Sequence, residues 1–296
     1  MSIPLRHPLR YRLEAMGARL LFGLLGAWSV DRASGFGAWL MRTFGPLTGA
    51  HRVGDINMQR ALPDLDADAR RAALTAAWDN LGRTMAEYPL LSRFLNGRES
   101  ERVELEGDEA LAMLAVLSAR GEPAILACAH FGNWEVLPIA IARAMKPVTI
   151  VYRPANNPLV DAMIADVRAP YAAGLAPKGA GGAREIVSAL KAGGLVAIVV
   201  DQKMNNGVEA QFFGRGAMTG PAVVKFAQRF ACPVFPVHTL RTGGAHFKVI
   251  IEKPWHFSPN DDVQEALTRI NQHIEGWIRR TPGQWLWMHR RWPKES

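Results

Sequence analysis

The chain has 296 residues, of which 49% are hydrophobic and 21% charged, and this balance excludes a disordered or fibrous protein. Its formal net charge of +8 favours anionic partners, whether nucleic acid, anionic lipid or an acidic protein. The two cysteines, Cys128 and Cys232, stand in apolar runs, which argues against a disulfide framework or a metal site built on cysteine.

The N-terminal segment, residues 1–47, predicts helices that associate with a membrane. The uncharged run 20–30 has 11 residues, about half of the roughly 20 that a membrane-spanning helix needs. Asp31 follows it directly, so no cleavage site of a signal peptide is expected. Basic residues flank an apolar stretch here, which favours an anchor lying in the interface of an anionic membrane. An ordinary buried amphipathic helix is the alternative. The arginines concerned are Arg6, Arg10, Arg12 and Arg19.

The rest of the chain, residues 48–296, predicts an α/β domain that includes a helical region at 67–95. From residue 102 onward, apolar strands alternate with helices of 10 to 20 residues. This alternation predicts a mainly parallel sheet covered by helices on both faces. We expect strands at 103–105, 124–129, 148–152, 195–200, 234–240 and 247–251, and helices at 108–119, 134–144, 157–169, 182–192, 219–231 and 261–280.

The hexapeptide His-Phe-Gly-Asn-Trp-Glu at 130–135 follows a predicted buried strand and opens a helix. Residues five apart on one continuous helix point away from each other, but Gly132 permits a bend that could bring His130 and Glu135 together. A carboxylate that fixes the imidazole tautomer makes the histidine a base for a hydroxyl. The alternative is a loop histidine beside an acid, without catalytic function.

Two further strands are followed by candidate site residues. Arg153 follows the strand at 148–152, where it could grip a phosphate or carboxylate, and Asn157 with Pro158 suits a helix start. Asp201 ends the strand at 195–200, where it could orient an arginine, bind a hydroxyl or ligate a cation; the alternative is an aspartate that only ends the strand in a turn. Ligands in open α/β sheets bind outside the carboxyl ends of strands, so these residues are expected near His130.

Together these motifs resemble those of glycerolipid-type acyltransferases with an H-x4-E/D signature, and more narrowly the lipid A biosynthesis (lauroyl/myristoyl) acyltransferase family. The resemblance rests on five segments that span nearly the whole chain. They are His130 to Glu135, the Tyr152-Arg153-Pro154 block with Asn157-Pro158, Asp201-Gln202, Phe212-Phe213-Gly214, and Gln284-Trp285-Leu286-Trp287 with Arg290-Arg291.

The resemblance implies a late, secondary acylation that moves a fatty acyl chain from acyl carrier protein to a hydroxyl of a lipid A precursor. His130 would be the general base, Glu135 its orienting partner, Arg168 the stabiliser of the oxyanion, and Asp201 a supporting catalytic residue. No cofactor and no metal are expected. The implied location is the cytoplasmic face of the bacterial inner membrane. The expected substrate-binding residues are Arg153, Asn133, Gln202, Phe212 and Phe213, the last two as a wall for the acyl chain or as core.

Other functions stay open at this point. The same chemistry could serve a lysophospholipid or another glycolipid as acceptor. The tryptophan- and arginine-rich C-terminal run could stack on nucleic acid, although such a protein would leave the His130 corner unexplained. A lipid-binding protein without catalysis is a further alternative.

Overall fold

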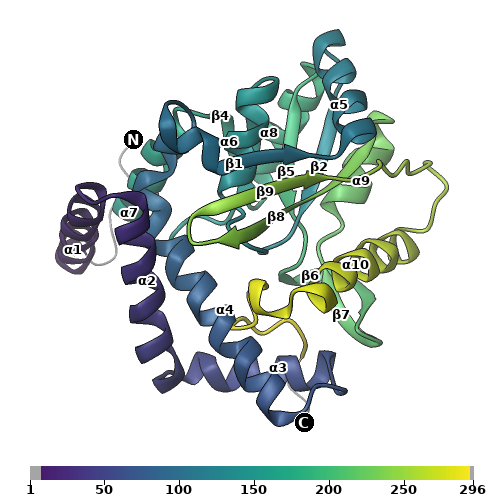
Figure 1. Cartoon of the computed structure of the whole chain (residues 1–296). Helices are drawn as coiled ribbons and strands as arrows, with labels where there is room; N and C mark the ends of the chain where they lie inside the picture. The colour runs from purple at the N-terminus through teal and green to yellow at the C-terminus, as the bar shows by residue number, and fades with distance from the viewer. Residues whose placement is uncertain (1–7, 294–296) are drawn as a thin grey trace.

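A seven-stranded sheet forms the centre of the computed structural model, which describes residues 8–293 (Figure 1). Neighbouring strands are parallel except β8 and β9, so the sheet is mainly parallel, as the sequence predicts. In spatial order the strands are β1 (Val103–Glu106), β9 (His246–Ile251), β8 (Val234–Gly243), β2 (Ala124–Cys128), β5 (Leu195–Val199), β3 (Val148–Tyr152) and β4 (Ala172–Pro177).

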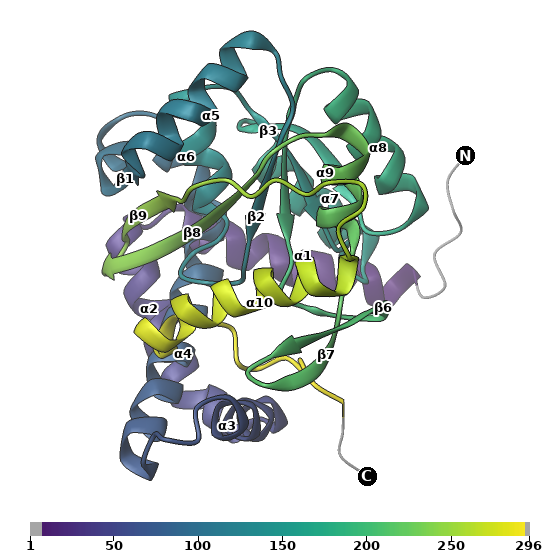
Figure 2. The same cartoon turned by 90° about the vertical axis from the view of Figure 1, so that its right-hand side faces the viewer.

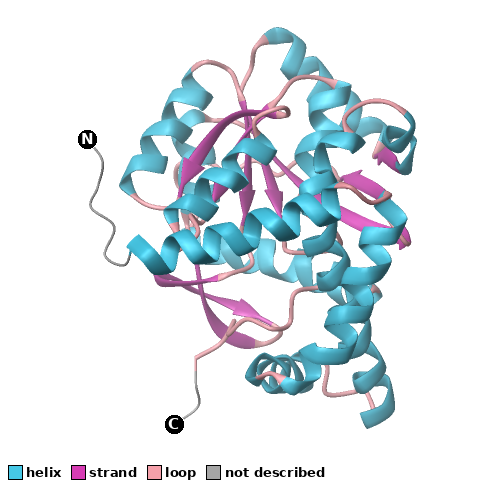
Figure 3. Ribbon diagram, turned by 90° about the vertical axis from the view of Figure 1, so that its left-hand side faces the viewer, coloured by secondary structure: helices cyan, strands magenta, loops and turns pink. Residues whose placement is uncertain are grey.

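Helices cover both faces of this sheet (Figure 3). Alternate residues of β2 show why both faces need cover, since Ile125 and Ala127 belong to one buried cluster whereas Leu126 and Cys128 belong to another. The helices that follow the strands are α5 (Asp108–Arg120), α6 (Val136–Ala144), α7 (Pro158–Arg168), α8 (Ala180–Lys191), α9 (Ala222–Phe230) and α10 (Val263–Arg280).

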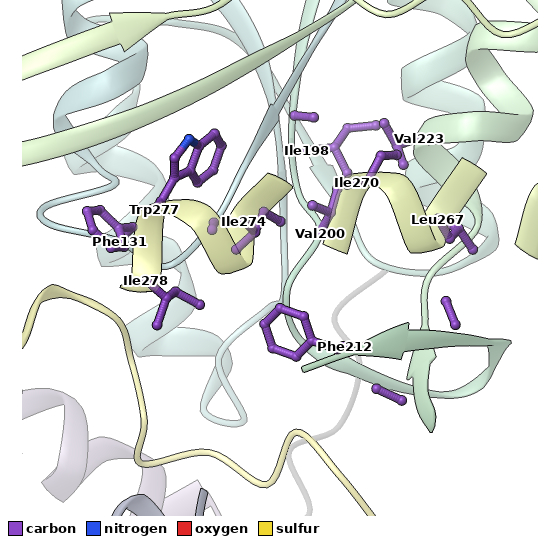
Figure 4. Close-up of a cluster of buried hydrophobic side chains, with 14 of the residues drawn as sticks. Phe131, Ile198, Val200, Phe212, Val223, Leu267, Ile270, Ile274, Trp277 and Ile278 are labelled. Atoms are coloured by element: carbon purple, nitrogen blue, oxygen red, sulfur yellow. The ribbon is translucent and has the colours of Figure 1, made fainter. Parts of the chain in front are cut away.

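Helix α10 covers one face of the sheet with a row of buried apolar side chains. Leu267, Ile270, Ile274 and Trp277 recur at three- and four-residue steps and are all buried, as Figure 4 shows. Asp262 caps the helix by accepting a hydrogen bond from the backbone N–H of Glu265. This row of buried side chains fixes the C-terminal end of α10, and with it the start of the segment that follows the helix and reaches the site.

The N-terminal third of the chain is helical. It contains α1 (Pro8–Gly26), α2 (Val30–Phe44), α3 (Gly49–Ala61) and α4 (Ala67–Glu87), with short 3-10 turns at Gly45–Leu47, Tyr88–Phe94 and Arg98–Arg102. Helix α2 lies along α4, and a Cβ on Gly37 would come within 2.2 Å of the carbonyl oxygen of Gly82. Only glycine permits this close approach. Arg6, part of the predicted anchor, lies outside the described residues.

The length and apolarity required to cross a bilayer are not combined in any helix between residues 8 and 293.

Several elements differ from the sequence prediction. The helix predicted at 67–95 ends at Glu87, because Pro89 cannot continue the α-helical hydrogen bonds. Strand β4 was missed because its alanines, glycine and proline have low strand propensity, which an edge position tolerates. The segment after Asp201, for which the sequence predicts no helix or strand, forms an antiparallel hairpin of β6 (Lys203–Phe212) and β7 (Arg215–Thr219), and α3 was not predicted.

Candidate active site

The site begins where two adjacent parallel strands end. Strands β2 and β5 pair in register, with Cys128 opposite Val199, and His130 and Asp201 each follow two residues later. Nδ1 of His130 lies 2.7 Å from Oδ1 of Asp201, and the backbone N–H of His130 donates to Oδ2 at 2.9 Å. Sheet register therefore places the histidine and this carboxylate side by side, as expected for residues that follow the carboxyl ends of neighbouring parallel strands.

Asp201 is buried and accepts a third hydrogen bond, from the indole Nε1 of Trp285 at 2.7 Å. Burial alone would raise the pKa of Asp201, but the charge and hydrogen bonds of His130 outweigh it and hold the pKa well below its usual range. The carboxylate is therefore ionised, and it favours the imidazole tautomer whose Nδ1–H donates to it.

The second ring nitrogen of His130 is then free to accept a proton. Gln202 Nε2 lies 3.2 Å from His130 Nε2, and both residues line the same cavity. With Nδ1–H committed to Asp201, the amide of Gln202 donates to the lone pair of Nε2, and an acceptor hydroxyl would take the place of this amide. The Trp134 ring stands edge-on to the imidazole, with 4.9 Å between the ring centroids. This nitrogen is the atom of the site best placed to act as a base.

The prediction that Glu135 orients the imidazole is wrong. Glu135 binds Arg168 instead, with Oε2 3.0 Å from Nε and Oε1 2.6 Å from Nη2. Gly132, at a φ of +56°, bends the chain as predicted, but the bend directs Glu135 toward the end of α7 and leaves Nδ1 of His130 to Asp201. His130 and Glu135 nevertheless line one cavity.

Arg168 is a buried cation with one unused donor. Burial lowers the pKa of its guanidinium, and the charge of Glu135 more than compensates, so that the pKa is raised overall. The guanidinium carbon lies 5.3 Å from the centroid of the Tyr152 ring, and Nη1 has no hydrogen-bond partner among residues 8–293. Arg168 lines the cavity but Nη1 is sealed from solvent, so this atom can donate to an oxygen of a bound molecule once the guanidinium shifts toward the cavity.

The cavity has a volume of about 790 Å³, within the range of about 300–1,000 Å³ that is usual for small-molecule sites. Burial raises the pKa of the Cys128 thiol on its wall, so this cysteine is a neutral wall residue and not a nucleophile. Apolar lining comes from β2, β3, β5, α6, α8 and α9, including Leu137, Ile150, Ile186, Ile198 and Phe226. Besides Arg168, the cations at the cavity are Arg153, Lys178, Lys225 and Arg229.

Three predicted substrate-binding residues lie outside this cavity. Asn133 is fully buried, where it donates to Glu87 Oε2 and accepts from the backbone N–H of Glu135. Phe212 and Phe213 pack near Trp292, with centroid distances of 5.4 Å and 6.4 Å. The alternative that the two phenylalanines belong to the core therefore fits the structure, whereas the prediction that they form a wall for the acyl chain does not. Arg153 and Gln202 do line the cavity.

Two contributors to the site were missed from the sequence. Trp285 belongs to a C-terminal motif to which no chemistry was assigned, although an indole N–H that is buried needs an acceptor. Lys178 follows β4, the strand that was not predicted, and the glycine-rich turn at 179–182 then opens α8 at the cavity wall. Within residues 8–293, no cluster of three or more His, Cys, Asp or Glu side chains is suited to hold a metal ion.

Known proteins are similar in sequence to this chain over most of its length. The family model described as bacterial lipid A biosynthesis acyltransferase matches residues 2–294. A lipid A biosynthesis palmitoleoyltransferase of Escherichia coli (strain K12) is 26% identical over 239 residues, which cover 79% of this chain and 76% of that protein. A lipid A biosynthesis acyltransferase of Haemophilus influenzae (strain ATCC 51907 / DSM 11121 / KW20 / Rd) is 23% identical over 240 residues, covering 78% and 72%. With the fold and the resemblance of its motifs, the family match leads to one conclusion: this chain belongs to the bacterial lipid A biosynthesis acyltransferases.

Proposed function

We propose that this enzyme moves a fatty acyl chain from the thioester of an acyl carrier protein to a hydroxyl of a lipid A precursor, as a late, secondary acylation. The observation that carries the proposal is the His130–Asp201 pair, 2.7 Å apart, beside a cavity of about 790 Å³ with apolar walls. An apolar wall suits a fatty chain, and a carboxylate-held imidazole suits the deprotonation of a hydroxyl.

In the proposed mechanism, Nε2 of His130 removes the proton of the acceptor hydroxyl while Asp201 stabilises the imidazolium that forms. The acceptor oxygen attacks the thioester carbonyl, and Arg168, its guanidinium shifted toward the cavity, donates to the developing oxyanion from the unused Nη1. When the carbon–sulfur bond breaks, the leaving thiolate takes the proton from His130. An ester and a free thiol result, and no acyl-enzyme is needed because a thioester is already activated.

The acceptor's phosphates have a candidate site at the cavity rim, at Arg153 and Lys178. Burial, and then the charge of Arg153, lower the pKa of the Lys178 ammonium. A bound phosphate would relieve this repulsion between two cations, and arginine can grip its oxygens with two parallel hydrogen bonds. These residues follow β3 and β4, close to the start of α7, where Asn157 donates to the carbonyl oxygen of Tyr11 in α1.

Helices α1 and α2 support a peripheral location on the cytoplasmic face of the inner membrane. Their exposed surface carries more large apolar side chains than a surface that contacts only water usually does. Arg12 and Arg19 of α1 are exposed and would attract an anionic leaflet. The apolar side chains, here called the apolar stripe, are Leu9, Leu13, Met16, Leu20, Leu21 and Leu24 of α1, with Trp39, Leu40, Phe44 and Leu47.

His130→Ala is expected to lower acyl transfer by about 10²–10⁴-fold, because it removes the general base. The measurement is transfer from acylated carrier protein to a lipid A precursor and, in parallel, to a lysophospholipid. His256→Ala is the matched control, since His256 is exposed and lies outside the cavity. Near-normal turnover in His130→Ala would contradict the mechanism, and transfer only to the lysophospholipid would contradict the acceptor.

A further inference from the structure

A basic hollow between α8 and α9 adjoins the active-site cavity. The hollow and the cavity share Ala183, Phe226 and Arg229, so they meet along one wall. Arg184, Val187, Ser188 and Lys191 complete the lining of the hollow. A molecule seated there lies next to the opening that leads toward His130.

The charges of this hollow have no counterpart within the protein. Arg184, Lys191 and Arg229 line the hollow and Lys225 lines the adjoining cavity; all four are exposed, and none of them forms an ion pair with another residue of the range 8–293. Among the described residues no acidic side chain lines the hollow, and the one acid of the cavity, Glu135, is bound to Arg168. Four like charges around an apolar floor of Val187 and Phe226 repel one another until an anionic partner covers them.

The position of the hollow favours a soluble partner over the membrane. The apolar stripe is carried by α1 and α2, which lie at one side of the molecule, whereas α9 lies toward the opposite side (Figure 1). A view turned by 90° shows α8 and α9 together, with α1 behind the sheet (Figure 2). When the stripe rests on a leaflet, α9 therefore faces away from it, toward the aqueous phase.

We propose that the α8–α9 hollow is the docking surface for an acidic carrier protein, with Arg184 and Lys191 as its outer contacts. This rests on the proposed function, which requires a donor whose thioester arm reaches His130. The arm enters past Phe226 and Arg229, where hollow and cavity meet. The acceptor lipid comes from the membrane side, at Arg153, so that the two substrates approach from different sides of one cavity.

The test compares two donors that carry the same acyl chain, the acylated carrier protein and a small acyl-pantetheine thioester. The variant is the full-length double substitution Arg184→Glu with Lys191→Glu, which changes the hollow without altering the cavity lining. We expect kcat/KM for the carrier-bound donor to fall at least about tenfold, because charge reversal opposes encounter with an acidic surface. Turnover of the small thioester should be unchanged. Arg98→Glu, an exposed charge reversal outside the hollow, is the matched control.

An equal loss with both donors, or an unchanged rate with the carrier-bound donor, would overturn the docking surface. A rise in KM for the lipid acceptor alone would also overturn it, since it would assign the hollow to lipid phosphates. Added salt should weaken the preference of the unaltered enzyme for the carrier-bound donor but not that of the double variant. If the unaltered enzyme transferred from neither donor, the proposed function itself would fail instead.

Discussion

Asp201 and Glu135 bind different partners at the carboxyl ends of the strands, and this separates two tasks. Asp201 holds His130 by the ring and by the backbone, and Glu135 holds Arg168 by two nitrogens of its guanidinium. In the proposed mechanism the first pair supplies the base and the second supplies the positive charge at the oxyanion. Loss of either carboxylate should therefore damage transfer, but with different effects on stability.

Glu135→Leu is expected to destabilise the fold by about 3–5 kcal/mol, because it leaves the buried charge of Arg168 without a partner. The double substitution Glu135→Leu with Arg168→Met should recover much of that stability, since no buried charge remains. Acyl transfer should stay low in both. Urea unfolding of the two variants measures the difference, and a double variant no more stable than the single one would contradict the pairing.

The pH dependence of stability should report Asp201. Its folded pKa lies below the roughly 3.9 of an aspartate in an unfolded chain, so its contribution is complete above about pH 4. As the pH falls below that value, the unfolded state takes up the proton first and the contribution is lost. Asp201→Asn should therefore flatten the decline in Tm on the acid side. The same acid slope in variant and unaltered protein would show that Asp201 is not the group concerned.

At the scale of elements, α1 has one buried face and one exposed face. Leu25 and Ala15 are buried, whereas Leu9, Leu13 and Leu20 are exposed by 71%, 56% and 69%, an exposure that burial in a lipid interface would explain. Polar contacts hold α1 against α7, where Asn157 also donates to Glu14 at 3.0 Å. The helix therefore has a fixed orientation from which to present its apolar stripe beside the cavity rim at Arg153.

Leu13→Glu with Leu20→Glu should weaken binding to vesicles that contain anionic phospholipid by more than about 100-fold. The reason is that each leucine loses roughly 1.5–3 kcal/mol of apolar burial. Cosedimentation with the vesicles measures the effect. Met113→Glu on α5 is the control, because Met113 is exposed apolar surface outside the stripe. Equal vesicle binding by the double variant would remove α1 from the membrane contact.

At the scale of the whole molecule, the C-terminal run completes a site built from distant segments. Trp285 donates to Asp201 across 84 residues of sequence, and the N–H of Leu286 donates to the carbonyl oxygen of His130. Helix α10 fixes the start of this run, because its buried stripe anchors it to the sheet (Figure 4). Trp285, Trp287, Arg291 and Trp292 of this run are buried and thus belong to the folded core.

Trp285→Phe keeps the ring in the core but removes the hydrogen bond to Asp201. We expect a loss of about 1.5–3 kcal/mol in stability, the usual value for a bond to a charged group, and a lower kcat with little change in KM. Thermal unfolding and steady-state kinetics measure the two effects. Trp39→Phe serves as the control, since Trp39 is half exposed on α2 and distant in sequence from the site. Equal kinetics in Trp285→Phe and the unaltered enzyme would show that the indole does not position Asp201.

The sequence by itself determined the local structure and the chemical groups. Apolar periods predicted the central strands and most helices within a few residues, because burial on one face or on two leaves a direct pattern in the chain. Motif resemblance identified the family and the residues His130, Glu135, Arg168 and Asp201. Strand β4 left no such pattern, since an edge strand of small residues needs little burial.

Only the tertiary structure decided which groups meet. Separation along the chain suggested that His130 would pair with Glu135, five residues away, whereas the sheet brings it Asp201, 71 residues away. Strand order is not written in local periodicity, because hydrogen bonds between parallel strands join segments whose pairing depends on the packing of the whole sheet. The partners of the two carboxylates, the cavity beside them and the basic hollow all follow from that order.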